Sequence, residues 1–193
     1  MLGMRRLIAL QPRLPPCRLG FCSRAGVDYF ALLGAERRFD LDPSTLHASY
    51  RERMAGSHPD RFGSQGSEAV QEASEHSSKI TEAYNVLRYP HHRAMHLLSL
   101  LGVPLTEETS GEELGPDFLA EVMEVREQLA DEALDQAALL RLRGANQKVI
   151  DEVSAGLTDA FGHSDLALAR RLTARLQYLY RIEENIRARL DAT

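Results

Sequence analysis

Three adjacent residues, His58, Pro59 and Asp60, combine an imidazole, a rigid ring and a carboxylate in a short polar break of the chain. Pro59 has a fixed φ and no amide proton, and it pushes His58 toward extended geometry. A carboxylate held in such a turn can accept charge-assisted hydrogen bonds from an arginine of a partner. The tripeptide is therefore suited to contact with another protein.

The segments on both sides of the tripeptide have the apolar period of amphipathic helices. One face of each segment is apolar, with Leu46, Tyr50 and Met54 before the tripeptide and Ala73, Ile80, Ala83, Tyr84 and Leu87 after it. Arg51 and Arg53 lie off the first apolar stripe, and Arg61 follows the tripeptide. We therefore expect two antiparallel helices with His58, Pro59 and Asp60 at the tip and positive charge near them.

A metal-dependent hydrolase built on His58, Asp60, His92 and His96 is the enzymatic alternative. His92 and His96 are four residues apart, a spacing that can place two ligands on one helical face. No acidic residue lies between them to act as a general base, and no third ligand or paired nucleophile and base has support in the sequence. We therefore predict no enzymatic activity and no bound metal or cofactor, and metal analysis of the purified protein would separate the two readings.

The first 27 residues differ in charge from the rest of the chain. They contain five arginines and no acidic residue, whereas the remainder contains 18 basic and 28 acidic residues. Such a basic head, with prolines after a short apolar run, is typical of a mitochondrial transit peptide, and a disordered tail is the alternative. Cys17 and Cys22 both lie in this head and are too few for a four-ligand zinc site. We predict a mitochondrial matrix protein.

The composition also limits the class of partner. No run approaches the ~20 apolar residues that a membrane span needs. The acidic remainder has no basic face with interleaved aromatic residues, which argues against nucleic acid as the main partner. The expected partners are therefore other proteins.

Start and stop signals predict an all-α fold in two parts. Asp28 can cap a first helix that Gly34 ends, and Asp42-Pro43 can begin the second. After a glycine- and proline-containing linker at 103–115, three long helices are predicted, with a break near Gly144 as one alternative. The predicted parts are 28–102, a helical hairpin with a trailing helix, and 116–193, a three-helix bundle.

The hairpin resembles the J-domain family of Hsp70 co-chaperones, whose His-Pro-Asp loop joins the second and third helices. The flanking matches are Asp28-Tyr29-Phe30-x-Leu32-Leu33-Gly34 before the loop and Ile80-x-x-Ala83-Tyr84-x-x-Leu87-x-x-Pro90-x-x-Arg93 after it. The resemblance implies that the tripeptide stimulates ATP hydrolysis by an Hsp70. It also implies that the helix bearing Arg51 and Arg53, together with Arg61, docks on an acidic Hsp70 surface.

The second part is similar to the HscB-type co-chaperones of iron–sulfur cluster assembly. The matching segments are Leu97-Leu98-x-Leu100-x-Gly102 and Phe118-Leu119-x-Glu121-x-Met123-Glu124-x-Arg126-Glu127-x-Leu129. This resemblance implies two partners, a specialised mitochondrial Hsp70 at the hairpin and the iron–sulfur scaffold protein at the bundle. The chain departs from some members in lacking four N-terminal cysteines for zinc, and from many in having the small Ala120.

Three apolar residues of the bundle are predicted to hold the scaffold protein: Leu119, Met123 and Tyr178. On a helical wheel, Leu119 and Met123 lie about 100° from the apolar stripe of their helix, and Tyr178 is about as far from its own. The scaffold-binding positions of HscB-type proteins match these three residues. The alternatives are that a wide bundle interior covers them, or that the chain is a generic J-domain co-chaperone delivering unfolded polypeptides to Hsp70.

Overall fold

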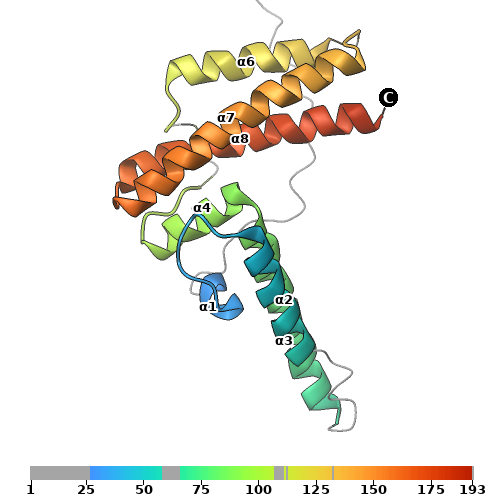
Figure 1. The fold of residues 1–193 in the computed structure, drawn as a ribbon, viewed down its shortest axis with the longest axis vertical. Helices are drawn as coiled ribbons and strands as arrows, with labels where there is room; N and C mark the ends of the chain where they lie inside the picture. Colours follow the sequence, from blue (N-terminus) through green and yellow to red (C-terminus); the bar gives the residue numbers. More distant parts are fainter. Residues whose placement is uncertain (1–26, 58–65, 107–110, 112, 132, 193) are drawn as a thin grey trace, which may run out of the picture.

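The computed structural model describes residues 27–57, 66–106, 111, 113–131 and 133–192, and every regular element within them is an α-helix. The predicted all-α class, with a helical hairpin followed by a three-helix bundle, is confirmed. A hairpin of two helices extends away from a stack of three others, with a further helix between these two parts (Figure 1). The helices are α1 (Tyr29–Leu33), α2 (Pro43–Ser57), α3 (Ser67–Arg88), α4 (Pro90–Leu100), α6 (Pro116–Ala130), α7 (Gln136–Gly162) and α8 (Leu166–Asp191).

The first two helices begin at the residues that their capping signals predict. The Asp28 carboxylate accepts hydrogen bonds from the amides of Phe30 and Ala31, and Gly34 ends α1 with a left-handed φ of 70°. At the start of α2, Asp42 Oδ2 accepts from the Thr45 amide at 2.8 Å. Asp42 also accepts hydrogen bonds from the Ser44 and Thr45 hydroxyls, which lowers the pKa of its carboxyl to about 2.

Helices α2 and α3 form the predicted hairpin, and α1 packs against α3. Leu46 of α2 is buried, whereas Tyr50 and Met54 are half-buried and pack against the same core. The 22 residues of α3 make a rod about 33 Å long, so most of the hairpin projects beyond α1 (Figure 1). The loop that joins α2 to α3, with His58, Pro59, Asp60 and Arg61, lies outside the described residues.

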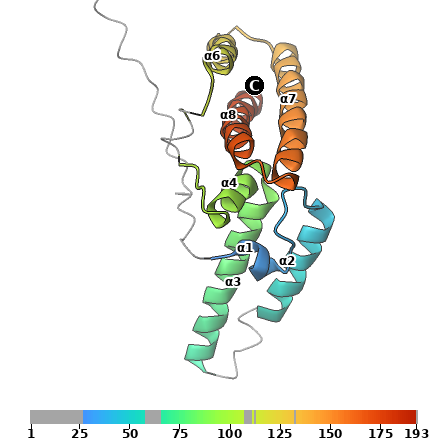
Figure 2. The ribbon, with the colours of Figure 1, turned by 90° about the vertical axis from the view of Figure 1, so that its left-hand side faces the viewer.

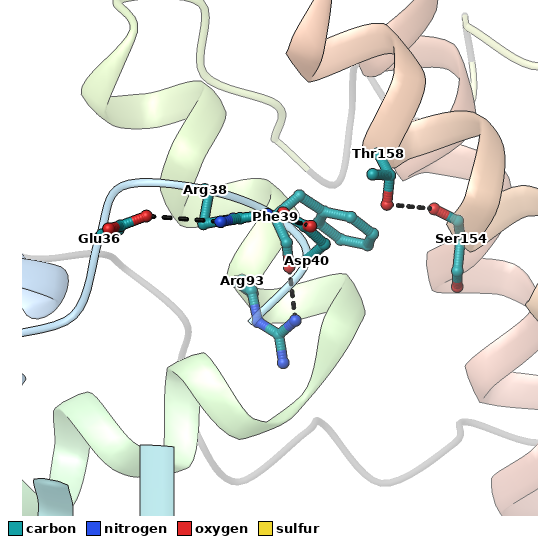
Figure 3. Close-up of polar contacts among 7 residues, drawn as sticks. All are labelled: Glu36, Arg38, Phe39, Asp40, Arg93, Ser154 and Thr158. Atoms are coloured by element: carbon teal, nitrogen blue, oxygen red, sulfur yellow. Dashed lines mark hydrogen bonds and ion pairs between the residues drawn. The ribbon is translucent and has the colours of Figure 1, made fainter. Parts of the chain in front are cut away.

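A buried arginine joins the α1–α2 connection to the end of α3. Arg93 of α4 is 5% exposed and donates from Nε to the Leu87 carbonyl oxygen at 2.7 Å. It also donates from Nη1 to the Phe39 carbonyl oxygen at 2.5 Å (Figure 3). Burial lowers the pKa of Arg93. The ring of Phe39 stacks on Phe161 of α7 with centroids 5.9 Å apart. Arg93 and Phe39 therefore connect the hairpin to the bundle.

The bundle consists of α7 and α8 as a close pair, with α6 lying along α8 (Figure 2). Helix α7 continues through Gly144, so the alternative of a break there is wrong. At Gly156 a Cβ would lie 3.1 Å from Leu172 Cδ1, which shows how closely α7 approaches α8. The turn between them contains Ser164 with a φ of 58°, and Asp165 caps α8.

The predicted linker contributes to the core at both of its ends. Leu105 and Leu114 are 5% and 7% exposed, respectively. Glu113 is paired with Arg170 of α8 at 2.9 Å. Through the described residues at its two ends, the segment therefore packs against the folded parts that it joins. No helix in the described part of the chain has both the length and the apolar composition of a membrane span.

Candidate partner-binding surfaces

The arginines predicted to contact Hsp70 from α2 are both exposed, but they lie on different faces of the helix. Two residues of separation rotate a side chain by about 200° around a helix axis. A Cβ at Gly34 would lie 2.8 Å from Arg53 Nη2, so the guanidinium of Arg53 lies over the C-terminus of α1. Arg51 is therefore the arginine of this pair that faces away from α1.

The histidine that ends the candidate metal pair is part of the core. His96 is 1% exposed, its Nε2 accepts a hydrogen bond from the Tyr29 amide at 3.1 Å, and its ring packs against those of Tyr29 and Phe30. Burial lowers the pKa of His96. This hydrogen bond between the Tyr29 amide and His96 Nε2 connects α1 to α4. Within the described residues there is no group of three or more histidine, cysteine, aspartate or glutamate side chains that could hold a metal.

Two neighbouring histidines lie at the contact between α4 and α8. The rings of His91 and His92 are 4.0 Å apart, and the His91 ring is 4.2 Å from that of Tyr180. Burial, with smaller contributions from His92 and Arg181, lowers the pKa of His91 to about 3, and burial lowers that of His92 to about 4. Both imidazoles are therefore neutral at neutral pH.

The residues predicted for the scaffold lie on two helices that run side by side. The guanidinium carbon of Arg175 on α8 lies 4.8 Å from the Phe118 ring centroid at one end of α6. Arg189 Nη1 donates to the Leu129 carbonyl oxygen at the other end, so the two helices run in the same direction. Tyr178 belongs to the stretch of α8 between these two arginines, alongside the helix that carries Leu119 and Met123.

The exposure of these residues separates them from the core stripe of their helix. Phe118 and Val122 are each 4% exposed, as the helical wheel predicts. Met123 is 61% exposed, whereas Leu119 and Tyr178 are half-buried and pack against the core with part of their surface. The bundle interior therefore leaves Met123 uncovered and covers Leu119 and Tyr178 only in part.

Sequence reasoning missed the cation beside this apolar group. The guanidinium carbon of Arg181 lies 5.3 Å from the Tyr178 ring centroid, a cation–π distance. The signal was available, because residues three apart on a helix are neighbours. Each of Leu119, Met123 and Tyr178 is thus apolar and at least partly exposed, and a positive charge lies beside Tyr178.

Comparison with known proteins identifies the family of the chain. The model of the HSCB C-terminal oligomerisation domain matches residues 114–187, which contain α6, α7 and most of α8. The human iron–sulfur cluster co-chaperone protein HscB is 33% identical over 174 residues, which cover 90% of this chain and 73% of the human protein. The chain belongs to the HscB co-chaperone family. An Azoarcus co-chaperone protein HscB homolog is 33% identical, over 86% of this chain and 94% of that protein.

Solved structures of HscB proteins extend the likeness to both parts of the fold. The crystal structure of human HscB has a TM-score of 0.78 and 30% sequence identity, and the match covers 85% of this chain and 82% of the human chain. The chaperone HscB from Vibrio cholerae has a TM-score of 0.75 and 27% identity, over 86% of this chain and 99% of that one. The predicted HscB-type family is thus confirmed. Because bacterial and eukaryotic members both match, the mitochondrial form stays a prediction.

Proposed function

We propose that this protein is an adaptor co-chaperone of iron–sulfur cluster assembly. It binds the cluster scaffold protein through α6 and α8, delivers it to a specialised Hsp70, and stimulates ATP hydrolysis by that Hsp70 to promote cluster transfer. The observation that carries the proposal is the exposed Met123 one helical turn from the half-buried Leu119, with the half-buried Tyr178 on the neighbouring helix α8, all within the matched HscB domain. Its human, mouse and Arabidopsis relatives are iron–sulfur cluster co-chaperones by name.

The scaffold surface is tested by replacing Leu119, Met123 and Tyr178 together with alanine. Interface anchors contribute roughly 1 to 3 kcal/mol each, so the affinity for the scaffold should fall at least about a hundredfold. Leu140→Ala on α7 is the matched control, because Leu140 is an apolar residue with 52% exposure on a different helix. Affinity is measured by calorimetry and folding by thermal melting on the same samples. Unchanged affinity in the triple variant would refute the surface.

The Hsp70 contact is tested at the tip of the hairpin. We propose that His58, Pro59 and Asp60 contact the Hsp70 with Arg51, Arg53 and Arg61 beside them, and that none of them performs chemistry. Asp60→Asn and His58→Gln should each abolish stimulation of ATP turnover and leave the melting temperature nearly unchanged, because residues that serve a partner contact outside the core should contribute little to folding. Stimulation that survives either change at saturating co-chaperone would contradict the assignment.

A generic J-domain co-chaperone would bind many unfolded polypeptides. The discriminating measurement is aggregation of a denatured model protein in the presence of this chain. Suppressed aggregation that persists in the triple alanine variant would favour the generic function. We expect no suppression, because the proposed surface comprises three residues and offers little room for an extended apolar client.

We also propose that the protein acts in the mitochondrial matrix after removal of its head. The support is compositional: five arginines and no acidic residue precede Asp28, in a segment outside the described residues. Intact-mass measurement of the protein from its native cell fraction tests this proposal. A mature chain that still begins at Met1, or one found outside mitochondria, would overturn it.

A further inference from the structure

Five side chains form one connected group across α2, α3 and the α3–α4 junction, here named the tyrosine–arginine strip. Its members are His47, Tyr50, Tyr84, Arg88 and Tyr89. The Tyr50 and Tyr84 rings stack with centroids 4.4 Å apart, and His47 lies 5.9 Å from Tyr84. The Arg88 guanidinium carbon is 5.8 Å from the Tyr84 ring centroid and 4.5 Å from that of Tyr89. Each side chain in the strip thus contacts the next.

The strip is held in place at its centre and is open to solvent at both ends. Tyr50 and Tyr84 are half-buried and pack against the hairpin core. Tyr89 is 39% exposed, and Arg88 and His47 are also exposed. Arg88 Nη2 donates to the Tyr89 hydroxyl oxygen at 2.6 Å. No carboxylate is paired with Arg88 within the described residues, so its charge is oriented by aromatic rings and is not neutralised.

This combination has the properties of a protein contact. Tyrosine and arginine are the residues that most often dominate interface energies. A side chain already held by stacking and hydrogen bonding loses little conformational entropy when a partner binds. The strip is also an arginine-containing patch on a chain that carries ten net negative charges after residue 27. Its chemistry therefore fits an acidic surface on the partner.

The position of the strip selects the partner. His47 lies one helical turn before Arg51 on α2, the helix that leads to His58, so the strip adjoins the proposed Hsp70 contact. A stable interface covers about 800 Å² on each side, which leaves room for contacts beyond the tripeptide and the arginines beside it. The proposed scaffold surface is instead on α6 and α8, and α6 lies on the far side of α8 from α4 and the hairpin (Figure 1).

We infer that the tyrosine–arginine strip is a second contact for the Hsp70 partner, in which Arg88 and Tyr89 receive an acidic surface of that protein. This inference rests on the proposed co-chaperone function. The strip adds affinity and orientation, while His58, Pro59 and Asp60 supply the stimulation itself. Changes in the strip should therefore alter the co-chaperone concentration needed for half-maximal stimulation and leave the maximal stimulated rate unchanged.

The test uses the full chain with its Hsp70 in a steady-state ATP hydrolysis assay. Arg88→Glu should raise the half-maximal concentration about tenfold at low salt, with a smaller effect at high salt, because charge reversal opposes an acidic partner. Arg88→Lys keeps the charge but loses the planar group that lies over the aromatic rings, so it should raise the half-maximal concentration by only about threefold. Arg187→Glu is the matched control. It makes the same charge change on α8, where the Arg187 side chain is 74% exposed, and should have no effect.

A second variant tests the aromatic part of the strip. Tyr89→Ala removes the ring beneath Arg88 and should raise the half-maximal concentration about fivefold with an unchanged melting temperature. Scaffold affinity should be unchanged in both Arg88→Glu and Tyr89→Ala. Loss of scaffold affinity in place of the Hsp70 effect would overturn the inference, as would a fall in the maximal rate alone.

The two proposals fail in different ways. If the parent protein stimulates the Hsp70 and Asp60→Asn abolishes this, but both strip variants behave as the parent does, the strip is not a contact and the co-chaperone function stands. If the parent protein produces no stimulation of any candidate Hsp70, the proposed function and the strip contact both fall.

Discussion

The α2–α3 hairpin and the α6–α8 pair present their proposed contacts by different physical means. On the hairpin, Arg51 and Arg88 are exposed charges that lie outside the core. On the bundle, Leu119 and Tyr178 pack against the core with one part of their surface and remain half-exposed with the other. Binding and stability should therefore be separable on the hairpin and partly coupled on the bundle.

The largest expected effect is at the junction between these regions. Arg93→Ala should lower the free energy of unfolding by about 3 kcal/mol, because it leaves the buried carbonyls of Phe39 and Leu87 without their donor. Arg93→Met keeps apolar packing but also removes the donor, so it should lose only somewhat less than Arg93→Ala. Urea unfolding measures both. Arg187→Ala on the exposed face of α8 is the control and should lose little stability. A loss in Arg93→Ala as small as that in Arg187→Ala would show that the junction does not hold the two regions together.

The structure of this junction could not have been predicted from the sequence. Phe39 lies between the helix end predicted at Gly34 and the helix start predicted at Asp42, yet it is 4% exposed and stacks on Phe161. The two residues are 122 positions apart, and periodicity within one helix carries no information about such pairs. The burial of Arg93 could not be predicted for the same reason, because its hydrogen-bond partner Phe39 is 54 residues away in the sequence.

Local signals, by contrast, predicted much of the fold. The caps at Asp28 and Asp42 and the stop at Gly34 depend on neighbouring residues, and all three are present. The buried stripe through Phe118 and Val122 follows from helical period alone. For the candidate sites, period could identify Leu119 and Met123 as lying off that stripe. It could not predict how far each is exposed, because that depends on the approach of α8.

The next largest effect concerns pH and the histidines between the two regions. His91 and His92 have pKa values lowered by burial to about 3 and about 4, against about 6.5 in the unfolded chain. Between about pH 3 and about pH 6.5, these histidines bind more protons in the unfolded chain than in the folded protein. The stability from neutral, buried rings is complete above about pH 6.5. It is lost as the pH falls, at up to about 1.4 kcal/mol per pH unit for each extra proton.

Variants assign this pH dependence to one ring. His91→Phe keeps an aromatic group against Tyr180 and removes the titrating nitrogen, so the loss of unfolding free energy between pH 6 and pH 4.5 should become less steep. Leu140→Ala, at an exposed residue without a titrating group, should leave the slope unchanged. Urea unfolding at a series of pH values gives the slopes. An unaltered slope in His91→Phe would show that carboxylates account for the dependence.

A smaller effect separates binding from stability within the bundle. Met123→Ala should weaken scaffold binding about tenfold and change the free energy of unfolding by less than about 0.5 kcal/mol, because Met123 is 61% exposed. Leu119→Ala should weaken binding to a similar extent and also cost about 1 to 2 kcal/mol of stability, because Leu119 packs against the core. Calorimetry and urea unfolding give the two quantities. If Leu119→Ala cost no more stability than Met123→Ala, binding and stability would be separable on the bundle as well, and the bundle would not differ from the hairpin in this respect.

The smallest expected effect compares two glycines of α7, away from the proposed contacts on α6 and α8. Alanine has a higher helix propensity than glycine by up to about 1 kcal/mol, so Gly144→Ala should raise the free energy of unfolding by 0.5 to 1 kcal/mol. Nothing lies within 4 Å of the Cβ that this change adds. At Gly156 the new Cβ would be 3.1 Å from Leu172 Cδ1, and the shift forced on α8 should offset the gain. Both variants should bind the scaffold as the parent does. Tighter scaffold binding in Gly144→Ala would mean that the scaffold surface forms only as the bundle folds. Binding would then be coupled to the stability of the whole bundle and not only to that of single side chains.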